Sequence, residues 1–275
     1  MILWVVAVQM DDVSFVDAYW GGGMAVMAAV SWLRLFDPGP LASVLMAMTV
    51  IWGGRLCIHL LLRWRREGED KRYARILRKD REKGRFASSA LTKIFLSQSV
   101  LLFLVSSPAQ YGILEASSLT PISGLALFGL GLWAVGIVFE WFGDWQLARF
   151  KADPENKGKV MDRGLWRYTR HPNYFGHLLQ WWAFYIIACN AIGGAWSFFG
   201  PLILSLYTLK VVIKDTEKRM LANVPEYSGY INKTNKLMPG VFQGGNQALD
   251  VIRSVVPFRQ FTAFAGLISR SENKL

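Results

Sequence analysis

Two short segments in the second half of the chain hold most of the side chains that could bind a polar ligand. Glu140 and Asp144 are four residues apart, so a helix would carry both carboxylates on one face. Segment 164–176 contains two arginines, a histidine, an asparagine and two tyrosines, and an apolar run begins at Phe175. Charged groups beside hydrocarbon are costly unless they are paired or used. The pattern therefore predicts a polar binding site at the mouth of a membrane span.

The ligand expected at this site is an anion. Pro172 suits the first turn of a helix, where its missing N–H would have no helical partner. The free backbone N–H groups at such a helix start attract phosphate or carboxylate. We expect Arg167, Arg170 and Lys151 to bind phosphate groups of a nucleotide. Asp144 and Asn173 are expected to bond its amide, hydroxyl or amine groups.

A simpler interpretation is that the arginines of this segment only reach to lipid headgroups and hold the topology. It accounts for the arginines alone. It does not explain why His171, Asn173 and Tyr174 gather at the same depth as Glu140 and Asp144, so we favour a binding site.

The apolar residues of the chain occur in blocks long enough to cross a membrane. The chain has 275 residues, 52% of them hydrophobic. A helix needs roughly 20 residues to cross about 30 Å of hydrocarbon. Six runs meet this length: 13–36, 41–62, 94–113, 122–142, 175–194 and 196–213. Segment 1–10 is read either as an interfacial stub or as the remainder of a seventh helix. The predicted fold is all-α, a polytopic membrane bundle of six or seven transmembrane helices.

Basic residues alternate between the connections, and this predicts the orientation. Three connections are rich in Lys and Arg: 63–93, 149–170 and the chain from 214 onward. The connections between them contain neither residue. The positive-inside rule places the basic loops of this multi-pass membrane protein in the cytoplasm. Topology also accounts for the net charge of +11, so membrane lipids are expected partners, and neither nucleic acid nor an obligate protein partner is.

The expected domain organisation is simple. Residues 1–240 are interpreted as one transmembrane domain and residues 241–275 as a C-terminal tail, which is either an interfacial helix or a poorly ordered end. Cys57 and Cys189 fall inside apolar runs, where cysteine acts as a small hydrophobe. His171 and His177 are six residues apart, a poor spacing for one helical face, and no third ligand stands out. No metal site is expected.

The first half of the chain also carries ionisable residues inside apolar runs or next to them. Asp17 lies a few residues inside the first apolar run and His59 lies inside the second. Tyr73 ends a charged segment that follows the second run. A charge inside a membrane needs a partner. Structural pairing between helices explains Asp17 as well as catalysis does, and a solvated charge run explains most of the residues around Tyr73.

Four motifs carry a resemblance to a known family. They are Glu140-Trp-Phe-Gly-Asp144, the segment 164–176, Ser14-Phe-Val-Asp17 and Gly68-Glu-Asp-Lys-Arg-Tyr73. Together they resemble the steroid 5-alpha-reductase superfamily, most closely its uncharacterised bacterial membrane branch. The resemblance implies a helical bundle that encloses NADPH from the cytoplasmic side. It also implies hydride transfer from the nicotinamide to a carbon–carbon double bond conjugated to a carbonyl.

The same resemblance places Asp144, Lys151, Gly164 and Asn173 where the reductases hold their cofactor. With the residues argued above, the expected cofactor-binding set is Glu140, Asp144, Lys151, Gly164, Arg167, Arg170, His171, Asn173 and Tyr174.

The chain departs from the steroid reductases at two positions. His177 stands where they have a glutamate after Asn-Tyr-Phe-Gly, and their catalytic tyrosine falls near Leu60. The proton donor is therefore unassigned. We expect His59, Tyr73 or Asp17 to polarise the substrate carbonyl in its place.

Two other functions are compatible with these residues. The Arg170-His-Pro-Asn-Tyr174 signature also resembles isoprenylcysteine carboxyl methyltransferases and phospholipid methyltransferases, which bind S-adenosylmethionine with it. Their second signature, an acidic pair followed by tyrosines, has a loose counterpart in Asp215–Tyr230. A noncatalytic lipid-binding or structural membrane protein is the third interpretation. Because basic residues dominate 149–170, we favour NADPH-dependent reduction of a lipophilic substrate taken from the bilayer.

Overall fold

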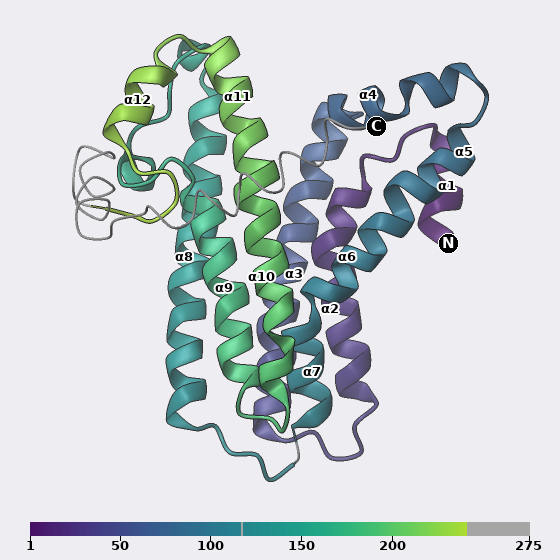
Figure 1. Cartoon of the computed structure of the whole chain (residues 1–275), viewed down its shortest axis with the longest axis vertical. Helices are drawn as coiled ribbons and strands as arrows, with labels where there is room; N and C mark the ends of the chain where they lie inside the picture. Colours follow the sequence, from purple (N-terminus) through teal and green to yellow (C-terminus); the bar gives the residue numbers. More distant parts are fainter. Residues whose placement is uncertain (117, 241–275) are drawn as a thin grey trace, which may run out of the picture. The chain divides into compact units, whose positions relative to one another are not determined.

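The structure, a computed structural model, describes residues 1–116 and 118–240, and these residues form helices and no strand (Figure 1). The all-α fold expected from the sequence is confirmed. The expected C-terminal tail, 241–275, lies outside the described residues. The α-helices are α1 (Ile2–Met10), α2 (Val16–Leu33), α3 (Pro40–Glu67), α4 (Lys71–Glu82), α5 (Phe86–Ser89), α6 (Ser97–Val105), α7 (Ser107–Glu115), α8 (Gly124–Ala152), α9 (Pro172–Ala188), α10 (Phe199–Tyr207), α11 (Ile213–Asn223) and α12 (Tyr227–Lys233).

Four stretches of helix are long and apolar enough to cross a membrane: Pro40–Glu67, Phe86–Val105, Gly124–Ala152 and Gly194–Asn223. The chain is an integral membrane protein. Helices α2 and α9 also coincide with expected spans and have 18 and 17 residues. The count of six or seven spans and the cytoplasmic side of the basic loops stay predictions.

Two expected spans differ from the helices observed. Span 94–113 is interrupted, because α6 ends at Val105 and α7 begins at Ser107. Pro108 has no N–H to donate and its ring clashes with the preceding turn, so the helix cannot run through. The last span extends well past residue 213, because α10 continues through a π-helical turn at 208–212 into α11 (Figure 1).

The described residues divide into two compact units. The first comprises 1–138 and 176–212, and the second comprises 139–175 and 213–240. The boundary falls inside the long helices α8, α9 and the α10–α11 helix, so each helix contributes one end to each unit.

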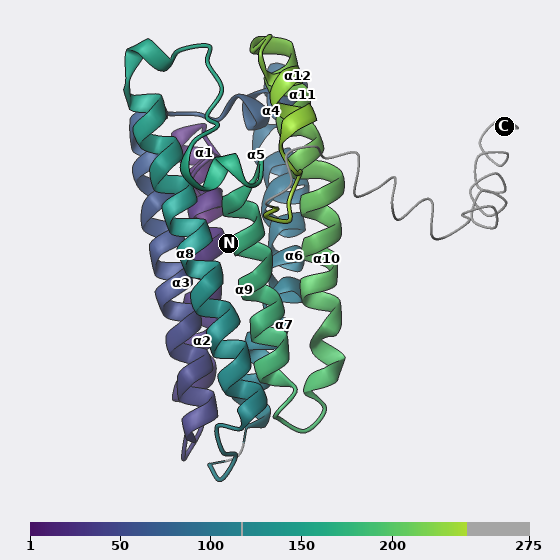
Figure 2. The ribbon, with the colours of Figure 1, turned by 90° about the vertical axis from the view of Figure 1, so that its left-hand side faces the viewer.

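In the first unit, α2 and α3 pack side by side through glycine (Figures 1 and 2). A Cβ atom built on Gly53 would lie 2.4 Å from the carbonyl oxygen of Gly21, and one on Gly21 would lie 2.6 Å from the oxygen of Gly53. Only hydrogen at both positions lets the two backbones approach this closely, a usual device in membrane helices.

Glycines spaced seven apart on α8 likewise allow α8 and α9 to approach each other closely. Gly129 and Gly136 face Ile187 and Gln180 in the first unit. Seven residues are close to two helical turns, so these glycines share one face. The other side of α8 carries exposed large apolar side chains: Leu127, Val135 and Val138. Such a face suits contact with lipid.

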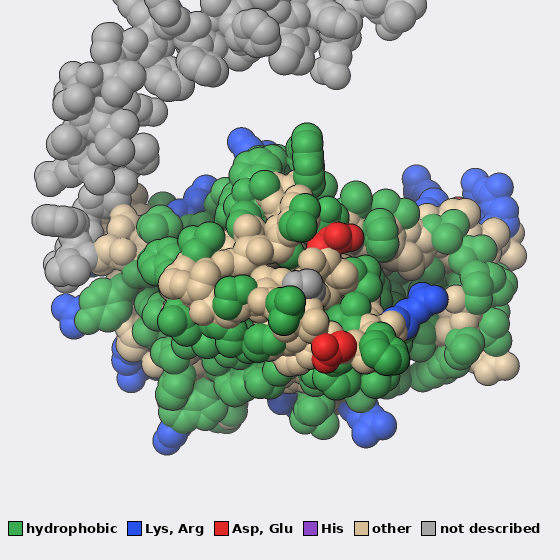
Figure 3. All heavy atoms as spheres, turned by 90° about the horizontal axis from the view of Figure 1, so that it is seen from below, with side chains coloured by type: hydrophobic (Ala, Val, Ile, Leu, Met, Phe, Trp, Pro, Cys, Tyr) green, Lys and Arg blue, Asp and Glu red, His purple; other side chains and the backbone are tan. Residues whose placement is uncertain are grey.

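The turns that join these helices expose few charges. Segments 35–40, 116–123 and 189–196 contain no Lys or Arg. Figure 3 shows the molecule from below, and hydrophobic side chains predominate on that face. The basic residues of the chain lie chiefly in the connections at the other ends of the helices.

Candidate functional site

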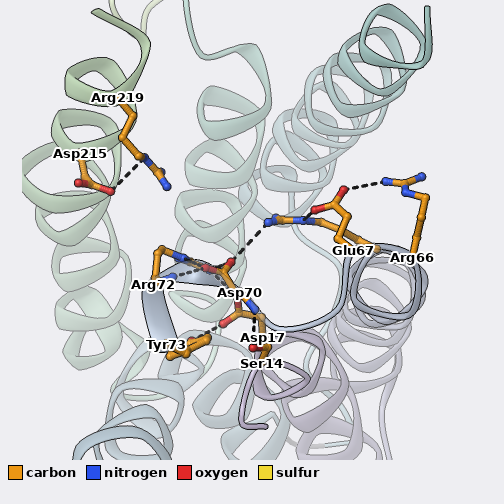
Figure 4. A network of polar contacts seen from close by, with 10 residues as sticks. Ser14, Asp17, Arg66, Glu67, Asp70, Arg72, Tyr73, Asp215 and Arg219 are labelled. Atoms are coloured by element: carbon orange, nitrogen blue, oxygen red, sulfur yellow. Dashed lines mark hydrogen bonds and ion pairs between the residues drawn. The ribbon is translucent and has the colours of Figure 1, made fainter. Parts of the chain in front are cut away.

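A first polar cluster joins α2 and α4 within the first unit. The Tyr73 hydroxyl donates to Asp17 Oδ1 at 2.5 Å, and Arg72 contacts Asp17 Oδ2 at 2.7 Å (Figure 4). The sequence predicted that Asp17 needs a partner at this depth. Asp17 has two, both on α4, more than fifty residues further along the chain. Two of the three predicted catalytic residues, Asp17 and Tyr73, are brought together.

Local chain geometry places α4 for this contact. Gly68 ends α3 with φ 71°, a conformation that glycine adopts without steric cost. Asp70 then caps α4 by accepting from the backbone N–H of Arg72, while its own N–H donates to the Ser14 hydroxyl at 2.8 Å. The connection is thus tied to the residue three positions before Asp17 (Figure 4).

The surroundings of Tyr73 and Asp70 shift the pKa values of both side chains. Burial, assisted by the neighbouring Asp17 carboxylate, raises the pKa of Tyr73, so its hydroxyl stays a donor at neutral pH. Burial would also raise the pKa of Asp70, but hydrogen bonds from Arg72 outweigh it and hold that pKa below its usual value. The Gln98 amide reaches the Tyr73 oxygen at 3.4 Å. His59, the third predicted catalytic residue, lies half-buried on α3.

A second polar cluster lies in the second unit, where α8 meets the start of α9. The Asn173 amide nitrogen donates to Asp144 Oδ1 at 3.0 Å. Asn173 Oδ1 is buried and has no hydrogen-bond partner among the described residues. Gly143 allows this approach, because a Cβ there would lie 3.1 Å from the Asn173 backbone nitrogen. Helix α9 begins at Pro172, as predicted.

The segment before α9 is held against α8 by its backbone. Gly164 has φ 59°, and a Cβ on it would lie 2.5 Å from the Gln146 side chain. The Gln146 side-chain oxygen accepts from the Leu165 N–H at 3.0 Å, and the Trp166 indole donates to the Gly143 carbonyl at 3.0 Å. Gly164 is thus required for both conformation and space.

Arg170 is buried within the protein. Its Nε donates to Glu217 at 2.8 Å, and its NH1 group donates to the carbonyl oxygens of Ile231 and Thr234 at 3.0 and 2.6 Å. The guanidinium therefore ties α11 and the segment after α12 to the start of α9. Its expected role in binding phosphate stays a prediction, and its observed contacts are structural.

His171 shares the same carboxylate. Its ring nitrogen Nε2 lies 3.2 Å from Glu217 Oε1, and the imidazole stacks on Tyr174 with 5.4 Å between ring centroids. Burial lowers the pKa of His171 and outweighs the opposing hydrogen bond to Glu217. His171 is therefore neutral at pH 7 and positions Tyr174 by stacking.

An open pocket of about 750 Å³ lies in the second unit beside this segment. Its lining includes two residues predicted from the sequence, Gly164 and Arg167, and adds charged residues from both sides. The remaining lining residues are Val160, Asp162, Arg163, Glu226, Gly229, Tyr230, Lys233 and Thr234. A volume of this size is typical of small-molecule sites.

The other two predicted cofactor residues lie on α8. Glu140 is buried, with 3% of its surface exposed, and is one turn from Asp144 on the same helix. Lys151 is exposed in the last turn. Within residues 1–116 and 118–240, no group of three or more His, Cys, Asp or Glu side chains is arranged to hold a metal ion.

The chain matches a known protein family over most of its length. A family model described as "Protein of unknown function (DUF1295)" matches residues 3–234. The chain belongs to this family, which falls within the steroid 5-alpha-reductase superfamily.

Curated relatives of this DUF1295 protein carry the name 3-oxo-5-alpha-steroid 4-dehydrogenase 1. The human protein is 29% identical over 29% of this chain and 30% of its own length. The rat protein is 27% identical over 42% of this chain and 41% of its own length, and the mouse protein 28% over 41% and 40%. The chain thus spans less than half the length of the curated relatives it matches. No solved structure matches it at a significant level.

The structure of this family member adds residues that sequence reasoning did not name as part of the site. Gln98 contacts Tyr73, and no motif marks Gln98 in the sequence. Arg163 and Lys233 line the pocket from segments about seventy residues apart. In the sequence, Arg163 was one of several basic residues in the loop 149–170.

Proposed function

We propose that this chain is an integral membrane reductase that uses NADPH to reduce a carbon–carbon double bond in a lipophilic substrate. The substrate is a steroid-like or other conjugated enone that enters from the bilayer. The observation that carries the proposal is the Asp144–Asn173 pair, which leaves a buried carbonyl oxygen without a partner among the described residues. An unpaired buried acceptor is costly, and a ligand N–H would satisfy it.

The residues around this pair fit a dinucleotide. Asn173 offers an acceptor and Asp144 a carboxylate, which suit the amide and hydroxyl hydrogens of a nucleotide. Arg167 and Lys151 are exposed and cationic, as phosphate binding requires. NADPH, when bound, supplies the hydride. The chain supplies the orientation of the ring and of the phosphates.

We assign to the first polar cluster, that of Asp17, Arg72 and Tyr73, the task of binding the carbonyl oxygen of the substrate. Tyr73 keeps its proton at neutral pH, so its hydroxyl can donate to a developing oxyanion. Without substrate, Asp17 accepts this single hydrogen, which must turn from Asp17 to the carbonyl oxygen when the substrate binds; Arg72 holds Asp17 in place. Reduction of a double bond consumes one proton in addition to the hydride, and we assign Tyr73 as its donor. His59 is a second candidate for the same role.

The membrane setting fits such a substrate. The outer face of α8 is apolar, and four stretches are apolar enough to span a bilayer. We place the basic loops, and with them the nucleotide, on the cytoplasmic side of a bacterial inner membrane. No nucleic acid or obligate protein partner is part of the proposal.

Methyl transfer from S-adenosylmethionine is the alternative. A sulfonium favours acidic or aromatic surroundings. Glu217 belongs to the chain's counterpart of the methyltransferase signature. Its carboxylate already pairs with Arg170 and contacts His171. Tyr230 of the same signature donates to the Trp166 carbonyl. Because Glu217 and Tyr230 already bond to other parts of the chain, they support the methyltransferase interpretation less than the sequence did.

Binding measurements separate these functions. We would measure the thermal stability of the purified protein in detergent with NADPH, NADH or S-adenosylmethionine. The proposal predicts stabilisation by NADPH in the wild type and a weaker effect in Asn173→Ala. Stabilisation by S-adenosylmethionine alone would establish the alternative. Stabilisation by none of the three would favour a noncatalytic lipid-binding protein.

A further inference from the structure

The outer face of α4 carries three cations, each about one helical turn from the next. Lys71, Arg75 and Lys79 are spaced four residues apart, so they lie on one side of the helix. All three are exposed, and none of them forms an ion pair within residues 1–116 and 118–240. Like charges at this spacing repel one another and destabilise a helix. The arrangement therefore favours an anion bound along this face.

The carboxylates closest in sequence to these cations already have partners. Within segment 69–82, each acid pairs with a different basic side chain at an N–O distance of 4.0 Å or less: Glu69 with Arg81, Asp70 with Arg72, Asp80 with Lys93, and Glu82 with Arg78. These pairs leave Lys71, Arg75 and Lys79 as the cations of α4 that the described part of the chain does not neutralise.

The opposite face of α4 fixes how the helix is turned. Tyr73 and Leu77 are buried in a cluster of apolar side chains that includes Phe86. Arg81 donates to Asp11 Oδ1 at 3.1 Å, which ties the last turn of α4 to the end of α1. The helix cannot rotate to hide its cations without taking these side chains out of the core.

The place of α4 in the chain indicates what lies beside it. One candidate membrane span, Pro40–Glu67, ends shortly before α4, and the next, Phe86–Val105, begins shortly after it. Short connections on both sides keep α4 near the ends of two spans, and lipid headgroups flank the hydrocarbon at that level. Figures 1 and 2 both show α4 at one end of the first unit, with α1 and α6 below it.

Apolar side chains are exposed below this cationic face. Ile2, Val5 and Met10 of α1 are all exposed. The other side of α1 packs against α5, where the Trp4 indole donates to the Ala87 carbonyl at 2.8 Å. Cations combined with exposed apolar side chains are typical of segments that lie in the membrane interface.

We propose that the outer face of α4 binds anionic phospholipid headgroups. Lys71, Arg75 and Lys79 donate to the lipid phosphates, and the exposed side chains of α1 lie among the acyl chains. The charges are complementary, because an anionic lipid such as phosphatidylglycerol has no cation of its own beside its phosphate, whereas phosphatidylcholine has one. The inference goes beyond the proposed function and does not depend on it.

The test measures lipid binding to the full chain in detergent by native mass spectrometry. Phosphatidylglycerol is compared with phosphatidylcholine of the same acyl chains. Lys71→Gln, Arg75→Gln and Lys79→Gln are made singly and together, and glutamine retains the tendency to form a helix. One basic residue beside anionic lipid contributes about a fivefold gain in affinity, so the triple variant should lose on the order of a hundredfold for phosphatidylglycerol. Phosphatidylcholine binding should not change.

Thermal unfolding without added lipid checks that the triple variant still folds. Removing like charges at four-residue spacing relieves repulsion. The triple variant should therefore unfold at the same temperature as the wild type or at a higher one. Phosphatidylglycerol should raise the unfolding temperature of the wild type and have a weaker effect on the variant.

The matched control combines Lys157→Gln, Lys159→Gln and Lys218→Gln. These lysines are exposed, lie in the second unit and form no ion pair in the part of the chain that the structure describes. The control removes the same charge as the triple variant and leaves α4 intact, so its preference for phosphatidylglycerol should persist.

Three outcomes would overturn the inference. If the control loses as much phosphatidylglycerol as the triple variant, lipid binding follows the net charge, and α4 is not a site. If the wild type binds both lipids equally, or the triple variant keeps the preference, the cations do not bind lipid phosphate. If poly-L-glutamate stabilises the wild type against heat and phosphatidylglycerol does not, the face binds an acidic protein. None of these results bears on nucleotide binding, so the proposed function is tested separately.

Discussion

Asn173 donates its side-chain amide to Asp144 Oδ1, and this bond decides which way the Asn173 carbonyl oxygen faces. With the nitrogen held by a carboxylate, the oxygen is left as the free end of the amide, and it is buried without a partner in the described part of the chain. Asp144 therefore orients Asn173, and in the proposed function this bond presents the Asn173 oxygen to the ligand.

Removing this acceptor should weaken nucleotide binding. Asn173→Ala deletes the buried carbonyl oxygen, and we expect the dissociation constant for NADPH to rise roughly tenfold, the cost of about one hydrogen bond. Asp144→Ala should have a similar effect, because it removes the acceptor that orients Asn173. Isothermal titration would measure both. Asn223→Ala is the control, since Asn223 is exposed and its amide donates to the Arg219 carbonyl of its own helix; equal losses in Asn173→Ala and the control would refute the assignment.

Tyr73 should affect turnover without affecting cofactor binding. Tyr73→Phe keeps the ring and removes the hydroxyl that Asp17 orients. Loss of one oxyanion donor typically lowers kcat about 10²–10³-fold. We expect that loss in kcat for an enone substrate, with the NADPH dissociation constant unchanged. Tyr19→Phe, which alters an exposed tyrosine of α2, should retain activity. If Tyr73→Phe kept full activity, Tyr73 would not be the donor to the substrate, and His59 would be the remaining candidate for that role.

Parts of this site were predictable because they depend on short sequence spacings. Four residues separate Glu140 from Asp144, and helical geometry alone puts them on one face of α8. Pro172 marks the start of α9 for an equally local reason. The apolar runs likewise predicted the long helices, because crossing hydrocarbon fixes their length.

The contacts that depend on tertiary structure were not predictable. Arg170 looks like a phosphate ligand in the sequence, yet its donors go to Glu217 and to two carbonyl oxygens more than sixty positions away. Nothing in the spacing of Arg170 distinguishes a buried cation from an exposed one such as Arg167. The break at Ser106 was missed for a different reason, because segment 94–113 was interpreted as one span although Pro108 lies inside it.

Breaking the Arg170–Glu217 pair should destabilise the protein. Both side chains are largely buried, 7% and 13% exposed. Without Arg170, the buried Glu217 carboxylate keeps only His171 and, at 4.0 Å, Lys236 among the described residues; breaking a buried pair costs about 3–5 kcal/mol. We expect Arg170→Met to unfold at clearly lower temperature than the wild type. Arg219→Met, at an exposed i, i+4 pair, should change the free energy of unfolding by less than about 1 kcal/mol. Similar losses in both variants would contradict a structural role for Arg170.

Stability should also depend on the pH through His171. Its pKa in the folded protein lies below that of free histidine, about 6.5. As the pH falls below about 6.5, the unfolded chain binds a proton that the folded chain does not, so stability is present above that pH and is lost below it. His171→Gln keeps a donor for Glu217 and cannot titrate. Unfolding temperatures between pH 7.5 and 5.5 should fall less steeply in the variant, and equal slopes would exclude His171 as the cause.

Adjacent glycines on α3 give the sharpest test of the packing in the first unit. Gly53→Ala would place a methyl group 2.4 Å from the Gly21 carbonyl oxygen, which belongs to a backbone and cannot rotate away. The helices α2 and α3 would have to separate, and overpacking of this kind costs about 1–3 kcal/mol. At Gly54, the next residue, a Cβ atom would have no neighbouring atom within 4 Å in the described part of the chain. Gly54→Ala should therefore be neutral or stabilising by up to about 1 kcal/mol, because alanine is the better helix former. Thermal unfolding in one detergent would compare the two, and if Gly53→Ala were as stable as Gly54→Ala, the close contact between α2 and α3 would be wrong.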